Sequence, residues 1–281
     1  MSEVEYTQLA DRIVEIYHSA ADVRHYAADE EEYLNTNVGG TSRMIELAKR
    51  ANAKYYHMST LSVSGDVLKD DRTFVRFTEA DYDIGQVWED NIYVKSKFLA
   101  EGLVFKAIEE GLTAKIFRLG RLVGRESDGR FQKNPESNAF YLLMKGFCQI
   151  GAIPVSASQM SIDLMPIDVC AKEVLVLKDS AETVYHIMNS APPTLGEVMT
   201  ALDERNRIVR DSEFVNVFRD NCQKLDRELW ALVMNHWHGL GTRKQEICVD
   251  NTETGKALIK AGYQQEATKI NIVLKEFWKG E

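Results

Sequence analysis

The sequence contains no uninterrupted run of about 18 apolar residues, which is the length a membrane-spanning helix needs. It also has no cluster of lysine and arginine suited to a phosphate backbone, and its net charge is −9. The 4 cysteines lie far apart and form no Cys-x-x-Cys pair, so neither a zinc site nor a disulfide framework is indicated. The opening stretch, MSEVEYTQLADR, is acidic and unlike a secretion signal. We therefore expect a cytoplasmic protein that binds neither membranes nor nucleic acid and holds no metal.

The chain has enough apolar material for a substantial core, because 44% of its 281 residues are hydrophobic. Its first part alternates short apolar runs with amphipathic stretches. The runs at 14–21, 53–59 and 113–124 predict buried strands, and the stretches at 37–51 and 91–111 predict helices. Strands that alternate with helices of this length form a parallel sheet through right-handed crossovers. The pattern therefore predicts an α/β fold.

The pattern changes after residue 124. The polar segment 125–138 is typical of an active-site loop, and a long helical tract is expected at 212–238. A further strand at 183–190 is expected to return to the sheet. We therefore predict a cofactor domain at 1–124 and a substrate-binding part at 125–281.

A tyrosine followed by a lysine four positions later occurs twice, at Tyr93/Lys97 and Tyr141/Lys145. Ligands of an open parallel sheet bind at the carboxyl ends of its strands. Tyr93 begins the helix that follows the loop after the second strand, so it can point at that edge, whereas Tyr141 lies beyond the third strand. We favour Tyr93 as the functional residue and interpret Tyr141 as a packing residue.

Positions four apart lie on one face of a helix, so Lys97 can sit beside Tyr93. An ammonium next to a phenol lowers the pKa of the tyrosine, which would suit proton transfer near neutral pH. The hydroxyl of Thr60, at the end of the second strand, could bind the same substrate oxygen. These groups suit hydride transfer at a carbonyl carbon, with the hydride carried by a nicotinamide cofactor.

The motifs HSAA, NVGGT, STLSVSG and YVKSK together resemble the extended short-chain dehydrogenase/reductase family over nearly the whole chain. The run FRLGRLVGRESDGRFQKNPESNAFYLLMKG is similar to the C-terminal thioester reductase domains of nonribosomal peptide synthetases and carboxylic acid reductases. The resemblance implies a partial Rossmann-like, doubly wound parallel sheet with a mostly helical C-terminal substrate subdomain. It also implies NADPH-dependent reductive release of a carrier-bound phosphopantetheine thioester as an aldehyde or alcohol.

The resemblance also assigns residues. It implies a catalytic triad of Thr60, Tyr93 and Lys97. The residues implied to bind the cofactor are Ser19, Ala20, Ala21, Asn37, Tyr93, Lys97 and Leu119. The residues implied to contact the substrate are Val63, Gln132 and Asn134.

One element of the family is missing from this sequence. The family begins with a strand, a glycine-rich turn and a helix that binds the cofactor pyrophosphate. Gly39 and Gly40 are adjacent but lack the required spacing, and we interpret them as close-packing positions. Aligned by motif, the chain begins at the family's fourth strand. We therefore expect weak or no NADPH binding in isolation. We also expect an exposed strand edge near 14–18 that favours a homodimer, or pairing with a missing N-terminal segment or partner chain.

Two other functions remain open at this stage. A nucleotide-sugar epimerase or dehydratase would share the triad, and an inactive fragment or interaction module would lack catalysis altogether. His18 is interpreted as a structural residue, and a metal site at the histidines of 235–239 is not favoured. Asp168 is expected to cap a helix, and Arg118 and Arg121 could hold a phosphate or form surface salt bridges.

Overall fold

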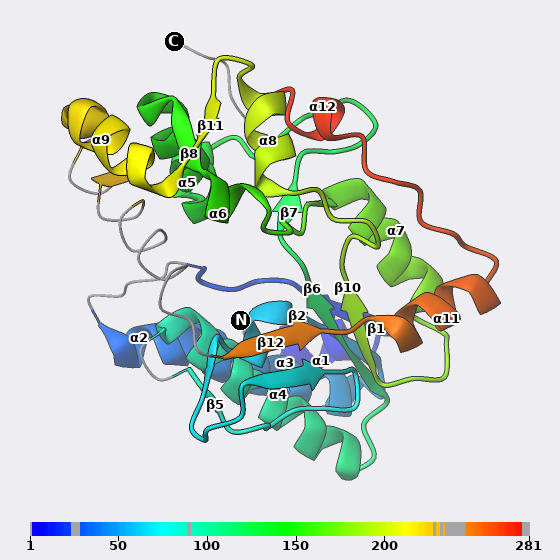
Figure 1. Ribbon diagram of the computed structural model, residues 1–281. Coiled ribbons are helices and arrows are strands. Elements are labelled where there is room, and N and C mark those ends of the chain that lie inside the picture. The colour runs from blue at the N-terminus through cyan, green and yellow to red at the C-terminus, as the bar shows by residue number, and fades with distance from the viewer. Residues whose placement is uncertain are drawn as a thin grey trace. The chain divides into compact units, whose positions relative to one another are not determined.

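The structure is a computed structural model, and it describes residues 2–23, 29–88, 91–226, 229, 230, 233 and 245–276 (Figure 1). The chain divides into two compact units. Unit 1 comprises Met1–Gly120, Glu173–Ile187 and Gln245–Gln264, and unit 2 comprises Arg121–Lys172, Met188–Lys244 and Gln265–Glu281.

The elements of unit 1 alternate between helices and strands. The helices are α1 (Glu3–Ala10), α2 (Glu30–Leu34), α3 (Gly40–Ala51), α4 (Ile92–Glu109) and α11 (Thr252–Lys260), with a π-helix at Asn35–Gly39 and a 3-10 helix at Leu61–Ser64. The strands are β1 (Glu15–His18), β2 (Lys54–Thr60), β3 (Val67–Leu68), β4 (Phe74–Phe77), β5 (Gln86–Val87), β6 (Ala114–Leu119), β10 (Val184–Ile187) and β12 (Glu246–Val249). The helix α7 (Ile167–Leu177) carries the chain from unit 2 into unit 1.

Four of these strands form the central sheet, in the order β1-β2-β6-β10, and every pair is parallel. This confirms the α/β fold, the strand expected at 183–190 and the position of β1 at an edge. The predicted strand at 113–124 is wrong at its end. β6 stops at Leu119, and β7 (Leu122–Val123) pairs with β9 (Met165–Pro166) in unit 2.

The helices α3 and α4 pack against each other and against the sheet (Figure 1). The core between them contains the buried side chains of Ile45, Ala48, Tyr55, Val104, Ala107 and Ile116. Burying these groups removes apolar surface from water, which is the main stabilising contribution to such a layer. The α4 helix begins at Asn91, whose side chain accepts the backbone N–H of Val94, and Gly111 follows its end with φ of 99°.

Unit 1 also includes parts of the chain that the sequence placed in the substrate-binding part. β12 pairs in parallel with β4, and α11 packs against β10. The predicted division at residue 124 therefore assigned these segments to the wrong side. Nothing in the local pattern of a four-residue strand identifies a partner so distant in the chain.

Unit 2 is built mostly from helices. Its elements are α5 (Ala139–Ile150), α6 (Val155–Ser158), α8 (Leu195–Leu202), α9 (Asp211–Asn221), α12 (Ile270–Val273), β7, β8 (Ala152–Pro154), β9, β11 (Arg207–Val209) and 3-10 helices at Pro135–Ser137 and Cys222–Lys224. Its core includes Phe147, Ile153, Met199 and Phe214. The helical tract predicted at 212–238 extends to Asn221 and one 3-10 turn, and much of its remainder lies outside the described residues.

No helix in the described part of the chain combines the length and the apolar character needed to cross a bilayer.

Candidate active site

Thr60 and Tyr93 meet at the carboxyl end of the central sheet. β2 ends at Thr60, whose hydroxyl accepts the backbone N–H of Ser62 at 3.2 Å and so starts the following turn. Tyr93 lies in the first turn of α4, just after the capping residue Asn91. The Thr60 side chain lies close enough to the Tyr93 phenol to affect its pKa. Two hydroxyl groups from separate elements therefore lie within reach of one substrate oxygen.

Lys97 lies one helical turn after Tyr93 and is 6% exposed. Its Nζ donates to the backbone carbonyl of Met58 at 2.7 Å, which fixes the ammonium against β2. Burial lowers the pKa of Lys97 to about 8, and the negative charge of Glu101 opposes this. The expected lowering of the tyrosine pKa is wrong for this structure. Burial raises the pKa of Tyr93, and the Thr60 side chain only partly opposes the rise.

The second tyrosine–lysine pair has a different setting. In α5 of unit 2, the Nζ of Lys145 forms an ion pair with Glu136 at 3.2 Å, and the ring of Tyr141 stacks on Phe131 with centroids 6.5 Å apart. The lysine is thus engaged by a carboxylate, and the tyrosine packs on an aromatic ring, as the sequence analysis expected for Tyr141.

Asn37 connects the loop after β1 to α4. It lies in the π-helix and is 3% exposed. Its amide nitrogen donates to the Ser96 hydroxyl at 2.9 Å and to the Asp22 carbonyl at 2.8 Å, and its side-chain oxygen accepts the N–H of Asp22 at 2.7 Å. All of these bonds are satisfied by protein groups, so Asn37 holds the loop on α4. π-helical turns are frequent at functional sites, because the extra residue re-aims nearby groups.

The other residues assigned to the cofactor lie at the same sheet edge. Ser19, Ala20 and Ala21 follow β1 directly. Leu119 is the last residue of β6 and is the register partner of Thr60 in β2. The sheet therefore brings these positions together at the ends of neighbouring strands.

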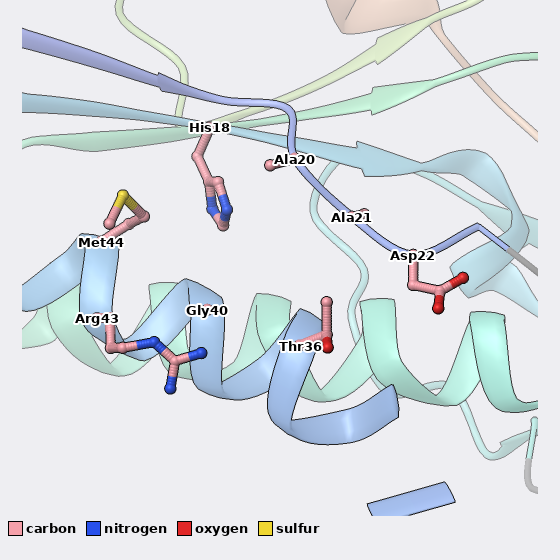
Figure 2. Close-up of a pocket in the computed structure, with 8 residues that line it drawn as sticks. All are labelled: His18, Ala20, Ala21, Asp22, Thr36, Gly40, Arg43 and Met44. Atoms are coloured by element: carbon pink, nitrogen blue, oxygen red, sulfur yellow. The ribbon is translucent and has the colours of Figure 1, made fainter. Parts of the chain in front are cut away.

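A pocket of about 550 Å³ opens beside the loop that follows β1. Figure 2 shows the His18 ring pointing from the strand end towards the helix that carries Gly40 and Met44, with the loop at Ala20 and Ala21 beside it. A Cβ at Gly40 would meet no atom within 4 Å, so this glycine leaves the pocket open. Our interpretation of Gly40 as a close-packing position is therefore wrong. At Gly39, by contrast, a Cβ would lie 2.6 Å from the side-chain oxygen of Asn35.

His18 is part of a hydrogen-bonded chain within the sheet layer. Its Nδ1 lies 2.7 Å from the Tyr55 hydroxyl, which is 3.3 Å from Nδ1 of His57. Burial and the charge of Lys97 lower the pKa of His18 and of His57, so both imidazoles are neutral at pH 7. These contacts agree with a structural role for His18, although its ring also lines the pocket.

The residues predicted to contact substrate have different surroundings. Val63 is fully buried with Phe77 and Phe98 in unit 1, so its side chain cannot contact a substrate in this conformation and we do not retain it. Gln132 and Asn134 are exposed in unit 2, where the Gln132 amide donates to the Asn134 carbonyl at 2.8 Å. These two remain predictions.

Three other expectations for charged residues have different outcomes. Arg118 is fully buried in an ion pair with Glu101, so it is neither a surface salt bridge nor a phosphate ligand. Arg121 places its guanidinium 4.5 Å from the centre of the Phe140 ring, and its role with a phosphate or in a surface salt bridge stays a prediction. Asp168 lies within the first turn of α7, and its carboxylate accepts the backbone N–H groups of residues 126 and 127. It also accepts the N–H of Val169 at 3.1 Å, so it holds a loop and binds one N–H at the start of the helix.

The histidines at 235–239 lie outside the described residues. Within the described ranges, no group of three or more histidine, cysteine or acidic side chains is arranged to hold a metal ion.

Residues 1–174 match an NAD-binding family described as male sterility protein. The chain belongs to this family. It is an extended short-chain dehydrogenase/reductase of the type found in nonribosomal peptide synthetase reductase domains.

Two synthetases illustrate its relatives. The chain is 28% identical over 241 residues to the nonribosomal peptide synthetase asaC of Aspergillus flavus, covering 81% of this chain and 22% of that protein. It is 26% identical over 234 residues to a linear gramicidin synthase polypeptide of Brevibacillus parabrevis, covering 79% of this chain and 4% of that polypeptide.

The fold is shared with a solved thiolation-reductase di-domain from an archaeal nonribosomal peptide synthetase. The two are 28% identical with a TM-score of 0.84, over 98% of this chain and 59% of the other. The chain therefore spans less than two thirds of the length of each of these three proteins.

The family implies a nicotinamide dinucleotide, and the described residues fit part of one. Ala20, Ala21 and Gly40 are small and leave an open pocket at the carboxyl end of the sheet, where such ligands bind. Tyr93 and Lys97 lie at the same end, within the same unit. The sequence offers no glycine-rich strand-turn-helix for the pyrophosphate.

Proposed function

We propose that this chain reduces an acyl or peptidyl thioester, carried on the phosphopantetheine arm of a carrier protein, and releases it as an aldehyde or alcohol with NADPH as reductant. The observation that carries this proposal is the proximity of the Thr60 and Tyr93 side chains at the end of the sheet. A solved neighbour joins a thiolation domain to a reductase domain, which supports a carrier-bound substrate.

In this proposal NADPH supplies the hydride to the thioester carbonyl carbon. The Thr60 hydroxyl hydrogen-bonds the carbonyl oxygen, and the Tyr93 phenol gives that oxygen a proton as negative charge develops there. Because the pKa of Tyr93 is raised, its phenol is protonated at neutral pH and is ready to act as the donor. The resulting hemithioacetal then breaks its carbon–sulfur bond, its hydroxyl proton passes to sulfur, and the pantetheine thiol leaves the aldehyde behind.

The remaining assignments belong to the same proposal. Lys97 holds a positive charge beneath Tyr93 and favours transfer of the Tyr93 proton. Asn37 keeps the loop that follows β1 on α4. Gln132 and Asn134, on the exposed loop of unit 2, contact the acyl chain or the pantetheine arm.

The test is reduction of an acyl-pantetheine thioester by the full chain. The reaction is monitored by the loss of NADPH fluorescence and by detection of the aldehyde. Because no glycine-rich turn binds the pyrophosphate, we expect weak NADPH affinity and would supply the cofactor in large excess. Tyr93→Phe should lower the rate by about 10²- to 10⁴-fold, since it removes the proton donor and little volume.

Tyr141→Phe is the matched control, because it removes a phenol hydroxyl from the other tyrosine–lysine pair and keeps the aromatic stack. It should retain the wild-type rate. Equal activity of the two variants would refute the role of Tyr93. Turnover of a nucleotide sugar in place of the thioester would replace the proposal with an epimerase or dehydratase.

A further inference from the structure

A fully buried polar cluster lies within unit 1, and no motif of the sequence predicts it. It consists of Ser59, Glu101, Arg118 and His186, which we call the Glu101 cluster, and each member is at most 4% exposed. Arg118 donates to the Glu101 carboxylate at 2.8 to 3.2 Å through Nε and Nη2, and Ser59 donates to the same carboxylate at 2.5 Å. Nη1 of Arg118 lies 3.1 Å from Nε2 of His186.

The cluster occupies one row of the sheet. Ser59 on β2, Arg118 on β6 and His186 on β10 are register partners in neighbouring strands. The next row towards the carboxyl end holds Thr60 and Leu119. Successive residues of a strand point to opposite faces of the sheet. The direction of the cluster side chains in one row therefore determines the direction of the Thr60 and Leu119 side chains in the next row.

The cluster also reaches the triad through α4. Glu101 follows Lys97 by four positions, so the two side chains lie on one face of the helix, one turn apart. Both are buried, and the Glu101 charge is the one that opposes the loss of a proton from Lys97. The histidines that approach Lys97 from β1 and β2, His18 and His57, are neutral and provide no counter-charge.

Arg118 and Ser59 hold the Glu101 carboxylate in place by hydrogen bonds. The buried group contains two cations, Arg118 and Lys97, and one carboxylate, Glu101. Tyr93 is neutral because its pKa is raised. Removing the carboxylate would leave the Lys97 ammonium in a region of low dielectric, where the Met58 carbonyl is its one hydrogen-bond partner among the described residues.

We propose that Glu101, fixed by Arg118 and Ser59, is a positioning residue that keeps Lys97 charged and in place one turn after Tyr93. The catalytic role of Glu101 rests on the proposed function, whereas its effect on the charge of Lys97 does not. It goes beyond the triad because Glu101 has no exposed surface with which to contact a substrate or cofactor.

The experiment measures the titration of Lys97 directly in the full chain. The protein is labelled with ¹³C at lysine Cε, the Lys97 signal is assigned by its absence in Lys97→Met, and its shift is followed with pH. The wild-type signal should titrate near pH 8. In the double variant Glu101→Leu/Arg118→Met the midpoint should fall by about one pH unit or more, because apolar side chains can replace a buried ion pair without loss of folding and, of the two groups removed, Glu101 is the one that shifts the pKa of Lys97.

Glu110→Gln is the control, because it removes another acid next to the end of α4 whose partner is the exposed Lys49. It should leave the Lys97 midpoint unchanged. If the apolar pair does not fold, Glu101→Gln/Arg118→Gln keeps polar contacts in the cluster and provides the same test. An unchanged Lys97 midpoint in either folded double variant overturns the proposal.

Enzyme assays separate this inference from the proposed function. If the chain reduces thioesters, the fall in rate at high pH should begin at a lower pH in the folded double variant. If the chain reduces no thioester, the NMR titration still decides whether Glu101 controls Lys97.

Discussion

At the scale of single residues, two similar pairs differ in their surroundings. Tyr93 lies beside Thr60, and Lys97 donates to the Met58 carbonyl. Lys145, by contrast, pairs with Glu136 on the surface of unit 2. The spacing of tyrosine and lysine is the same in both helices. Their positions relative to the strands indicated which pair to favour, but the direction of the Tyr93 pKa depended on burial, which the sequence did not reveal.

The histidine of the Glu101 cluster, His186, leads to a prediction on stability. Burial, together with the charge of Arg118, lowers the pKa of His186 to about 4, while the Asp250 carbonyl, 2.6 Å from Nδ1, opposes the shift. Between about pH 6.5 and pH 4 the His186 imidazole is therefore protonated in the unfolded chain and neutral in the folded chain. The free energy of unfolding should fall through that range as the pH falls, by up to roughly 3 kcal/mol from this group.

Urea denaturation at several pH values would measure this effect. His186→Gln should be less stable than the wild type at pH 7 and should lose less stability between pH 6.5 and pH 4. Parallel pH profiles for the two proteins would show that His186 does not contribute to the acid sensitivity.

At the scale of elements, the helices α3 and α11 provide a matched pair of tests. Gly40 lies in α3 on the pocket, and Gly255 lies in α11; a Cβ at either position would meet no atom within 4 Å. Replacing a helical glycine removes backbone freedom from the unfolded chain, so Gly40→Leu and Gly255→Leu should each be as stable as the wild type or more stable, by up to about 1 kcal/mol. Only the first places its side chain in the pocket.

Saturation-transfer NMR with excess NADPH would compare the two variants. Gly40→Leu should lose most of the cofactor signal, and Gly255→Leu should keep it. Loss in both, or in neither, would mean that this pocket is not part of the cofactor site.

The sequence predicted the strands that lead into the site because each is a continuous apolar run followed by small or hydroxyl-bearing residues. It also predicted the edge position of β1. It overextended β6, because LVG after Gly120 has the same apolar character as the strand although β7 pairs elsewhere. It missed Glu101, although the four-residue spacing from Lys97 was visible, because a glutamate on a helix is usually exposed.

At the scale of the whole molecule, unit 1 is assembled from three separated segments. The first segment alone would leave β6 without β10, β4 without β12 and Arg118 without His186. A fragment ending at Gly120 should therefore lack a cooperative thermal transition and should bind a hydrophobic dye. Circular dichroism of the fragment beside the full chain would measure this, and a sharp melting transition in the fragment would contradict the expectation.

The parallel pairing of β6 with β10 also has a consequence for biosynthesis. Leu119 leaves the ribosome roughly 65 residues before Val184, and at about 5 to 20 residues per second this interval lasts roughly 3 to 13 seconds. During this interval the backbone amides and carbonyls of β6 that later pair with β10 are exposed on the nascent chain. The Arg118 guanidinium also lacks its partner His186. A chaperone that shields this emerging strand would raise the yield of native protein more than one that acts after the last residue has been added.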